Sequence, residues 1–180
     1  MLKAVLSHKD LTKVEDYYRC VSDLLRDRNV LRLDDFGHHF GATRFQHSLN
    51  VSYYNYLLCR FFHLNAKAAA RAGLLHDFFF YDRKDHIKTE RTHAAEHAHT
   101  AFINASEMFP LTELEGDMII NHMWPMTTDL PRHPETFMIT VADKFCCLAE
   151  IMCCALCAGT RKIRLAESFA LMLILRIITH

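Results

Sequence analysis

Residues 66–81 read AKAAARAGLLHDFFFY. Alanine is a strong helix former, and its small side chain lets a neighbouring helix come close, so the stretch predicts a tightly packed helix over residues 66–77. An apolar run, residues 72–75, directly precedes His76 and Asp77, so the helix leads these two side chains out of the interior. An ionised aspartate at such a place is costly unless hydrogen bonds or a cation compensate its charge.

Helical patterns continue on both sides of this stretch. Apolar residues recur at helical spacing before it, and three prolines between residues 125 and 134 interrupt the pattern after it. No repeat or linker divides the chain, so we expect one all-α domain over residues 1–180. The expected helices cover residues 11–25, 45–62, 66–77, 92–108, 113–123, 135–157 and 165–177, with loops at 32–43, 81–91 and 125–134.

The composition excludes several classes of protein. Hydrophobic residues make up 51% and charged residues 23% of the 180, which is typical of a globular domain. Five glycines and four prolines are too few for an all-β fold rich in tight turns. The 21 basic and 21 acidic residues balance, so no overall positive field favours duplex nucleic acid as a partner.

Cysteine usage and the chain ends bear on the compartment. Seven cysteines, five of them between Cys146 and Cys157, do not resemble a disulfide framework, so a cytoplasmic location is expected. No signal peptide is visible at the start of the chain. The most apolar stretch, residues 170–179, contains Arg176 and is too short to span a membrane. We expect it to form a C-terminal helix that packs on the core, or alternatively docks a second subunit in a homodimer.

Several histidine and aspartate residues lie at predicted helix ends or turns, at positions where packing of a hydrophobic core does not require them. His93 and His97 are four residues apart, on one face of a predicted helix. Isolated aspartates on apolar helices, together with several histidines, are typical of a metal site built from helix faces. The residues of interest are His47 in RFQHSLNV, His76–Asp77, His93 and His97 in THAAEH, His122 in IINHMW and Asp143 in VADKF.

The order H…HD…H…H…D resembles the HD-domain superfamily of metal-dependent phosphohydrolases. The segments GLLHDFFFYD, NHMWPM and ADKF are similar to those of small stand-alone bacterial HD proteins, and the resemblance covers about residues 44–150. It implies a helical HD bundle with two divalent cations. The implied ligands are His47, His76, Asp77 and Asp143 for the first cation, and His97 and His122 for the second, with Asp77 bridging the two.

The resemblance also implies a reaction. Imidazoles and carboxylates suit iron, manganese, cobalt, zinc or magnesium, and two such ions can clamp a phosphoryl group and activate water. We therefore expect a metal-dependent hydrolase of a phosphomonoester or a nucleotide-like phosphate, with Asp77 as the central catalytic residue. His93 is the alternative to His97 as ligand, and otherwise a substrate contact.

Basic residues near these positions are candidates for binding the phosphate. Arg44 precedes His47 by one helical turn on the same face, and Lys144 follows Asp143 directly. The two loops after His76–Asp77 and His122 are expected to form the rim of the pocket. The predicted substrate-binding residues are Arg44, Lys84, His93, Arg132 and Lys144.

Several alternatives stay open. A mixed-valent di-iron oxygenase of the HD type has a similar ligand set, and a non-catalytic regulatory HD module binds metal or nucleotide without turnover. Alarmone hydrolysis is disfavoured, because EHAHTAF stands where a Glu-Asp pair is expected. His38 and His39 lie in a loop before His47 that could bring them to the site. Cys146, Cys153 and Cys157 share a helix face with Glu150, and Cys147 and Cys154 lie beside it. These cysteines are expected to pack as small hydrophobes, with a zinc or redox role as the alternative.

Overall fold

The architecture is entirely helical. A computed structural model describes residues 11–38, 42–81 and 93–159. These ranges form seven α-helices and two short 3-10 helices, and they contain no β-strand, only an isolated bridge between Gly37 and Thr43. The predicted all-α bundle is therefore confirmed. The elements are α1 (Leu11–Val21), η1 (Leu24–Arg26), α2 (Arg28–Arg32), η2 (Leu33–Asp35), α3 (Arg44–Phe61), α4 (Ala66–Leu75), α5 (His93–Met108), α6 (Glu113–Asn121) and α7 (Pro134–Gly159).

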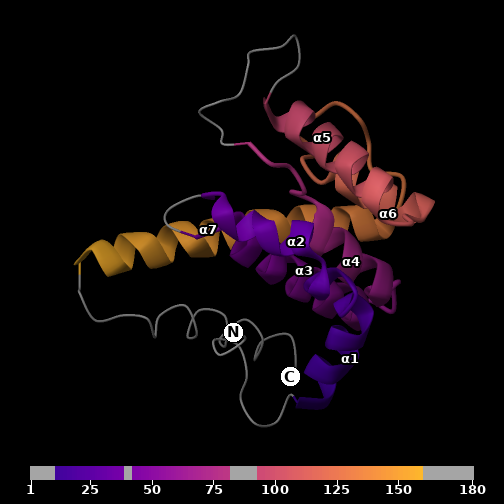
Figure 1. Cartoon of the computed structure of the whole chain (residues 1–180), viewed down its shortest axis with the longest axis horizontal. Coiled ribbons are helices and arrows are strands. Elements are labelled where there is room, and N and C mark those ends of the chain that lie inside the picture. Colours follow the sequence, from indigo (N-terminus) through magenta and orange to yellow (C-terminus); the bar gives the residue numbers. More distant parts are fainter. Residues whose placement is uncertain (1–10, 39–41, 82–92, 160–180) are drawn as a thin grey trace.

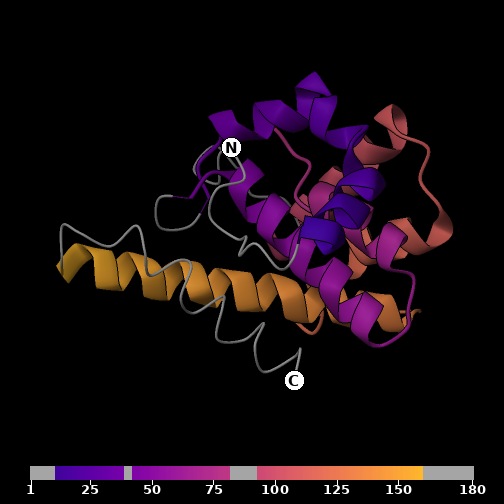
Figure 2. The same ribbon diagram turned by 90° about the horizontal axis from the view of Figure 1, so that it is seen from below.

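Helix α3 lies at the centre of the bundle. It packs against α4 on one side and α7 on another, while α1 and α6 contact α4, and α5 packs on α6 (Figure 1). Helix α7 is the longest, with 26 residues, and its C-terminal part extends beyond the other helices in both views (Figure 2). Five helices, α3 to α7, therefore surround one region of the interior.

The contact between α3 and α4 is very close. A Cβ added at Gly73 would lie 2.6 Å from the Cα of Ser52, so only glycine fits there without a shift of the backbone. Polar side chains of α3 reach carbonyls of α4 across this contact. Ser52 Oγ donates to the Ala70 carbonyl at 2.6 Å, and Asn55 Nδ2 donates to that of Ala69 at 2.9 Å. The small residues of α4 thus permit the close approach that the alanine-rich sequence predicts.

The boundaries of the helices differ from the predictions in places. The predicted helix over residues 11–25 ends at Val21, and a short helix, α2, begins after Asp27. The Asp27 carboxylate caps α2 by accepting hydrogen bonds from the main-chain N–H groups of Asn29 and Val30. The predicted helix over 165–177 lies outside the described residues, so the seven helices observed are not the same seven that were predicted.

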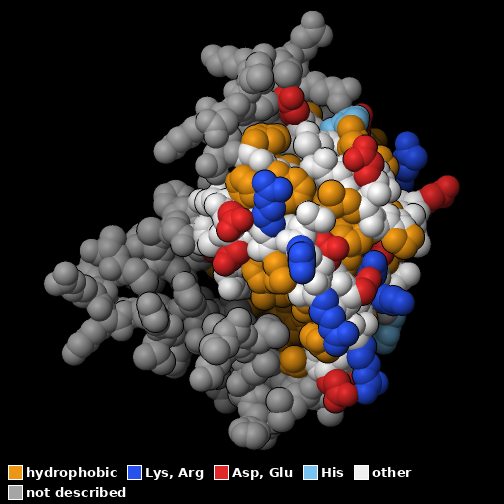
Figure 3. Space-filling view, viewed as in Figure 1, with side chains coloured by type: hydrophobic (Ala, Val, Ile, Leu, Met, Phe, Trp, Pro, Cys, Tyr) orange, Lys and Arg blue, Asp and Glu red, His pale blue; other side chains and the backbone are white. Residues whose placement is uncertain are grey.

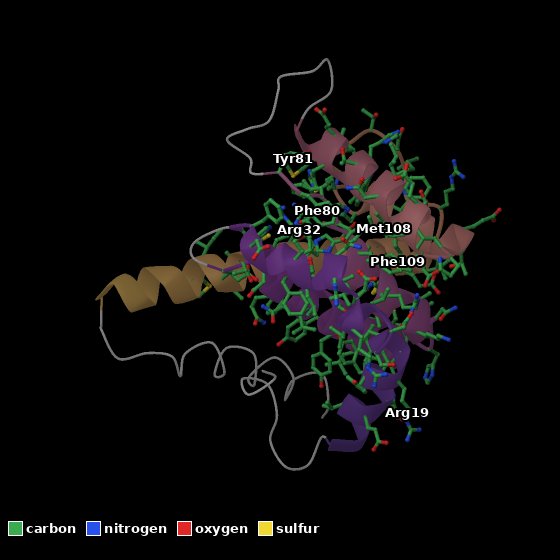
Figure 4. All side chains as sticks on the ribbon, viewed as in Figure 1. Arg19, Arg32, Phe80, Tyr81, Met108 and Phe109 are labelled. Carbon is green, nitrogen blue, oxygen red and sulfur yellow. The ribbon has the colours of Figure 1, made fainter. Side chains whose placement is uncertain are left out.

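The segment after α4 is anchored in the core. Phe78 is fully buried, and its ring lies 4.9 Å from that of Phe80 and 5.7 Å from that of Phe109. Phe80 in turn lies beside Arg32, whose guanidinium is 5.4 Å from the ring centroid (Figure 4). These contacts fix the end of α4, which carries His76 and Asp77.

The surface carries charge of both signs. The face seen in Figure 3 interleaves acidic and basic side chains with hydrophobic ones. Among the described helices, none combines the length and the apolar character needed to cross a membrane.

Candidate metal centre

The six residues predicted as metal ligands meet in the interior. They come from five helices or their ends, and each is at most 7% exposed. His47 lies on α3, His76 and Asp77 follow α4, His97 lies on α5, His122 follows α6, and Asp143 lies on α7.

Two of these histidines end their helices in the same way. His76 and His122 are the C-cap residues of α4 and α6. The Nδ1 of His76 lies 2.8 Å from the Gly73 carbonyl oxygen, and that of His122 lies 2.7 Å from the Ile119 carbonyl oxygen. A carbonyl only accepts, so each Nδ1 carries the hydrogen and each neutral Nε2 keeps a lone pair. This arrangement is common in histidines that bind metals.

The Nε2 atoms freed in this way face the site. His76 Nε2 is buried and has no hydrogen-bond partner among the described residues. His122 Nε2 lies 3.1 Å from the Nε2 of His97. Buried polar atoms are nearly always satisfied, so a lone pair of an imidazole nitrogen beside carboxylates is suited to bind a cation.

The carboxylate of Asp77 lies between two groups of histidines. Its Oδ1 is 3.5 Å from His97 Nε2 and 3.9 Å from His122 Nε2. Its Oδ2 is 3.8 Å from His76 Nε2 and 3.5 Å from His38 Nε2. Because the two oxygens face different imidazoles, Asp77 can contribute one oxygen to each of two groups of potential ligands.

Asp143 joins the group that includes His76. Its Oδ1 is 3.1 Å from His47 Nε2 and 3.8 Å from His76 Nε2. Two donors bound to one ion at about 2.1 Å and at right angles are about 3.0 Å apart, and wider angles give longer separations. The separations of 3.1–3.9 Å are therefore those of donors that can share an ion, and the buried histidine and aspartate cluster can hold a metal ion.

The protonation states match that use. Burial, followed by the neighbouring His76 and His97, lowers the pKa of His122 to about 3. Burial also lowers the pKa of His76. Although burial opposes ionisation of Asp77, the imidazoles around it hold its pKa well below the usual value. Near neutral pH His76 and His122 are thus neutral imidazoles and Asp77 is an ionised carboxylate, which are the forms that bind cations.

His47 differs from the other histidines. Burial disfavours its charged form, but hydrogen bonds to Asp143 and Glu150 raise its pKa to about 10. Without an ion, a protonated His47 therefore neutralises part of the carboxylate charge. A cation that takes the Nε2 of His47 has to displace that proton.

Three residues near the site were not among the predicted ligands. Glu150 places both carboxylate oxygens 3.1 Å from His47 Nδ1. His38 stacks on the ring of His47 with centroids 3.8 Å apart. Cys147 Sγ lies 3.7 Å from Asp143 Oδ1. Cys147 and Glu150 follow Asp143 by four and seven residues on α7, a spacing that places all three on one helix face and was the available signal.

Arg44 is buried rather than open to solvent. Its guanidinium donates to the carbonyls of Phe79 at 2.7 Å and Tyr81 at 3.0 Å, and it lies 3.7 Å from the Phe79 ring centroid. The side chain therefore holds the segment that follows Asp77. A contact between Arg44 and substrate stays a prediction.

The other predicted substrate contacts are placed differently. Lys144 Nζ lies 3.6 Å from Asp143 Oδ2 and donates to the His122 carbonyl at 3.4 Å, with the side chain 38% exposed. Arg132 is exposed in the loop before α7. Lys84 and the side chain of His93 lie outside the described residues. Of this group, Lys144 alone is placed beside the cluster by the described contacts.

Comparison with known proteins gave no match, whether to family models, to curated proteins or to solved structures. The interpretation of the site therefore depends on its geometry and chemistry.

Proposed function

We propose that this protein is a metal-dependent phosphohydrolase of the HD type, acting on a phosphomonoester or a nucleotide-like phosphate. The observation that supports this most strongly is the meeting of the residues of the H…HD…H…H…D order in one buried cluster. Residues up to 96 positions apart, such as His47 and Asp143, have donor atoms 3.1 Å apart. His76 Nε2, buried beside Asp77 and Asp143 without a hydrogen-bond partner among the described residues, adds to this support.

The donor set fits two divalent cations that share Asp77. His47, His76 and Asp143 would hold the first with one oxygen of Asp77, and His97 and His122 the second with the other. Nitrogen and carboxylate donors suit iron, manganese, cobalt or zinc, and magnesium is a further candidate. When bound, such a pair supplies charge to neutralise phosphoryl oxygens and lowers the pKa of water to near neutrality.

The chain itself supplies the remaining functions. Five packed helices keep the ligands in place and bury them from bulk water. The Lys144 ammonium, 38% exposed beside Asp143, is placed to attract an anionic group at the rim. Arg44 fixes the main chain after Asp77, so it helps to orient the shared carboxylate.

The test combines metal analysis with an activity screen. Protein purified without chelators is analysed for metals and then screened for phosphate release from nucleotides and sugar phosphates, with and without oxygen. We expect about two equivalents of a transition metal and oxygen-independent release. Asp77→Asn should lose both metal and release, whereas Asp129→Asn in the exposed loop before α7 should keep both.

Each other outcome overturns the proposal. Oxygen consumption with an organic substrate and no phosphate release identifies the di-iron oxygenase. Tight nucleotide binding that never leads to turnover identifies a regulatory module. Unchanged metal content in the Asp77→Asn protein removes the shared carboxylate from the centre.

A further inference from the structure

The residue before the loop that enters α3 reaches the candidate metal centre. His38 stacks on His47 with an interplanar angle of 15° and a centroid distance of 3.8 Å, and its side chain is 11% exposed. Its Nε2 lies 3.5 Å from Asp77 Oδ2, the same oxygen that faces His76. We propose that His38 is a further ligand of the cation on this side of Asp77, with Glu150 as its positioning residue. The inference rests on the proposed metal centre.

The main chain fixes His38 before any ion binds. Gly37 pairs with Thr43 in an antiparallel bridge, and the N–H of His38 donates to the Ala42 carbonyl at 2.9 Å. His38 thus lies on a paired segment, six residues before α3 begins at Arg44. A side chain on a paired segment can be held in a productive position at a low entropic cost.

Glu150 orients two imidazoles at once. One of its oxygens is 3.5 Å from His38 Nδ1, and both are 3.1 Å from His47 Nδ1. A carboxylate that receives the Nδ1–H of a histidine fixes the ring so that Nε2 points to the metal. The two rings are stacked nearly parallel, so Glu150 faces the Nδ1 side of both, while His38 Nε2 lies 3.5 Å from Asp77 and His47 Nε2 lies 3.1 Å from Asp143.

The donor atoms satisfy the same distance criterion as the predicted ligands. One nitrogen each of His38 and His47 and one oxygen of Asp77 all lie within 4.8 Å of one another. The rival role is a counter-ion, in which His38 merely balances the charge of Asp77 and leaves when a cation arrives. The two roles predict different effects of removing the His38 side chain. If His38 is a ligand, its removal weakens cation binding. If His38 is a competing counter-ion, its removal strengthens cation binding or leaves it unchanged.

Cobalt(II) is the probe, because its visible absorption reports the ligands directly. Full-length protein freed of metal is titrated with Co²⁺ by calorimetry and absorption. For His38→Ala we expect at least about tenfold weaker binding of one Co²⁺ and an altered visible spectrum. For Glu150→Gln we expect about 10–100-fold weaker binding with little change in the spectrum, since a positioning residue and not a ligand is lost. The control is His63→Asn, at an exposed position of positive φ that asparagine tolerates.

The outcomes separate this inference from the function it rests on. If the wild type binds no Co²⁺, the metal centre itself is refuted. If the wild type binds Co²⁺ and His38→Ala binds it equally well or more tightly, only the role of His38 is refuted. If the His38→Ala protein fails to fold, a measurement on the wild type still tests the proposal. In Zn²⁺-loaded protein with ¹⁵N-labelled histidine, the His38 Nε2 resonance should move to the position of a metal-bound nitrogen. A resonance that stays at the position of free imidazole overturns the proposal.

Discussion

Replacing Gly73 by alanine should loosen the contact that holds His76 in the cluster. The added Cβ would lie 2.6 Å from Ser52 Cα and 2.9 Å from Ser52 N. Both are main-chain atoms of α3, so no change of rotamer can relieve the overlap and the two helices have to move apart. The Gly73 carbonyl also accepts the Nδ1 hydrogen of His76, so a shift here is transmitted to a predicted ligand.

The size of the effect follows from the overlap. Ordinary contact begins at 3.4 Å, so the backbones must separate by about 0.8 Å at this point. Overpacking of this kind costs about 1–3 kcal/mol. Alanine regains about 1 kcal/mol over glycine in helix propensity. The expected loss in free energy of unfolding is therefore up to about 2 kcal/mol, or a decrease of up to roughly 8 °C in Tm for a domain of this size.

Urea denaturation and thermal unfolding of metal-free protein measure this loss, and a Co²⁺ titration measures its effect on the cluster. Gly37→Ala is the matched control for stability, because a Cβ at Gly37 meets nothing within 4 Å. We expect the Gly73→Ala protein to be less stable and to bind Co²⁺ more weakly. Wild-type stability together with wild-type Co²⁺ affinity would refute the claim that this close approach positions the ligands.

Three further predictions follow from other contacts. Burial opposes protonation of His47, but its carboxylate partners raise its pKa to about 10. Binding of Co²⁺ should therefore release a proton, and the affinity for Co²⁺ should increase about tenfold per pH unit between pH 7 and 9. An affinity that does not change with pH in calorimetry contradicts this prediction. Arg44→Lys should lower the free energy of unfolding by about 2–3 kcal/mol, because lysine cannot reproduce both hydrogen bonds to the segment after α4, whereas exposed Arg19→Lys should not change it. Asp117→Ala should cost a similar amount in urea denaturation, because three donors around it lose their acceptor, and exposed Asp129→Ala should be neutral.

The long helices could be predicted because each carries enough turns for its apolar spacing to be visible. Helix α2 has five residues and shows no period, so only its cap, Asp27, could have indicated it. The ends of α4 and α6 were placed two residues too late. A pattern of apolar residues does not reveal that His76 and His122 turn back to carbonyls of their own helices and end them there.

The candidate site shows a similar division. His76 and Asp143 stand out in the sequence because apolar runs precede them, His47 stands out through the motif order, and the structure brings the three together. Glu150 was considered only as an interruption among cysteines, although it lies two turns after Asp143 on the same helix. His38 could not be assigned, because the bridge between neighbouring loop residues that directs it depends on tertiary contacts.

The charge balance of the cluster explains how these helices can pack around it before an ion arrives. Three carboxylates, those of Asp77, Asp143 and Glu150, have pKa values below their usual range although burial opposes their ionisation. Two imidazoles, His38 and His47, have raised pKa values despite burial, because these same carboxylates lie beside them. At neutral pH the proton on His47 offsets part of the negative charge, and so limits the cost of burying it. A divalent cation brings more positive charge than a proton does to the same oxygens. Replacing a proton by such a cation would therefore stabilise the buried carboxylates further.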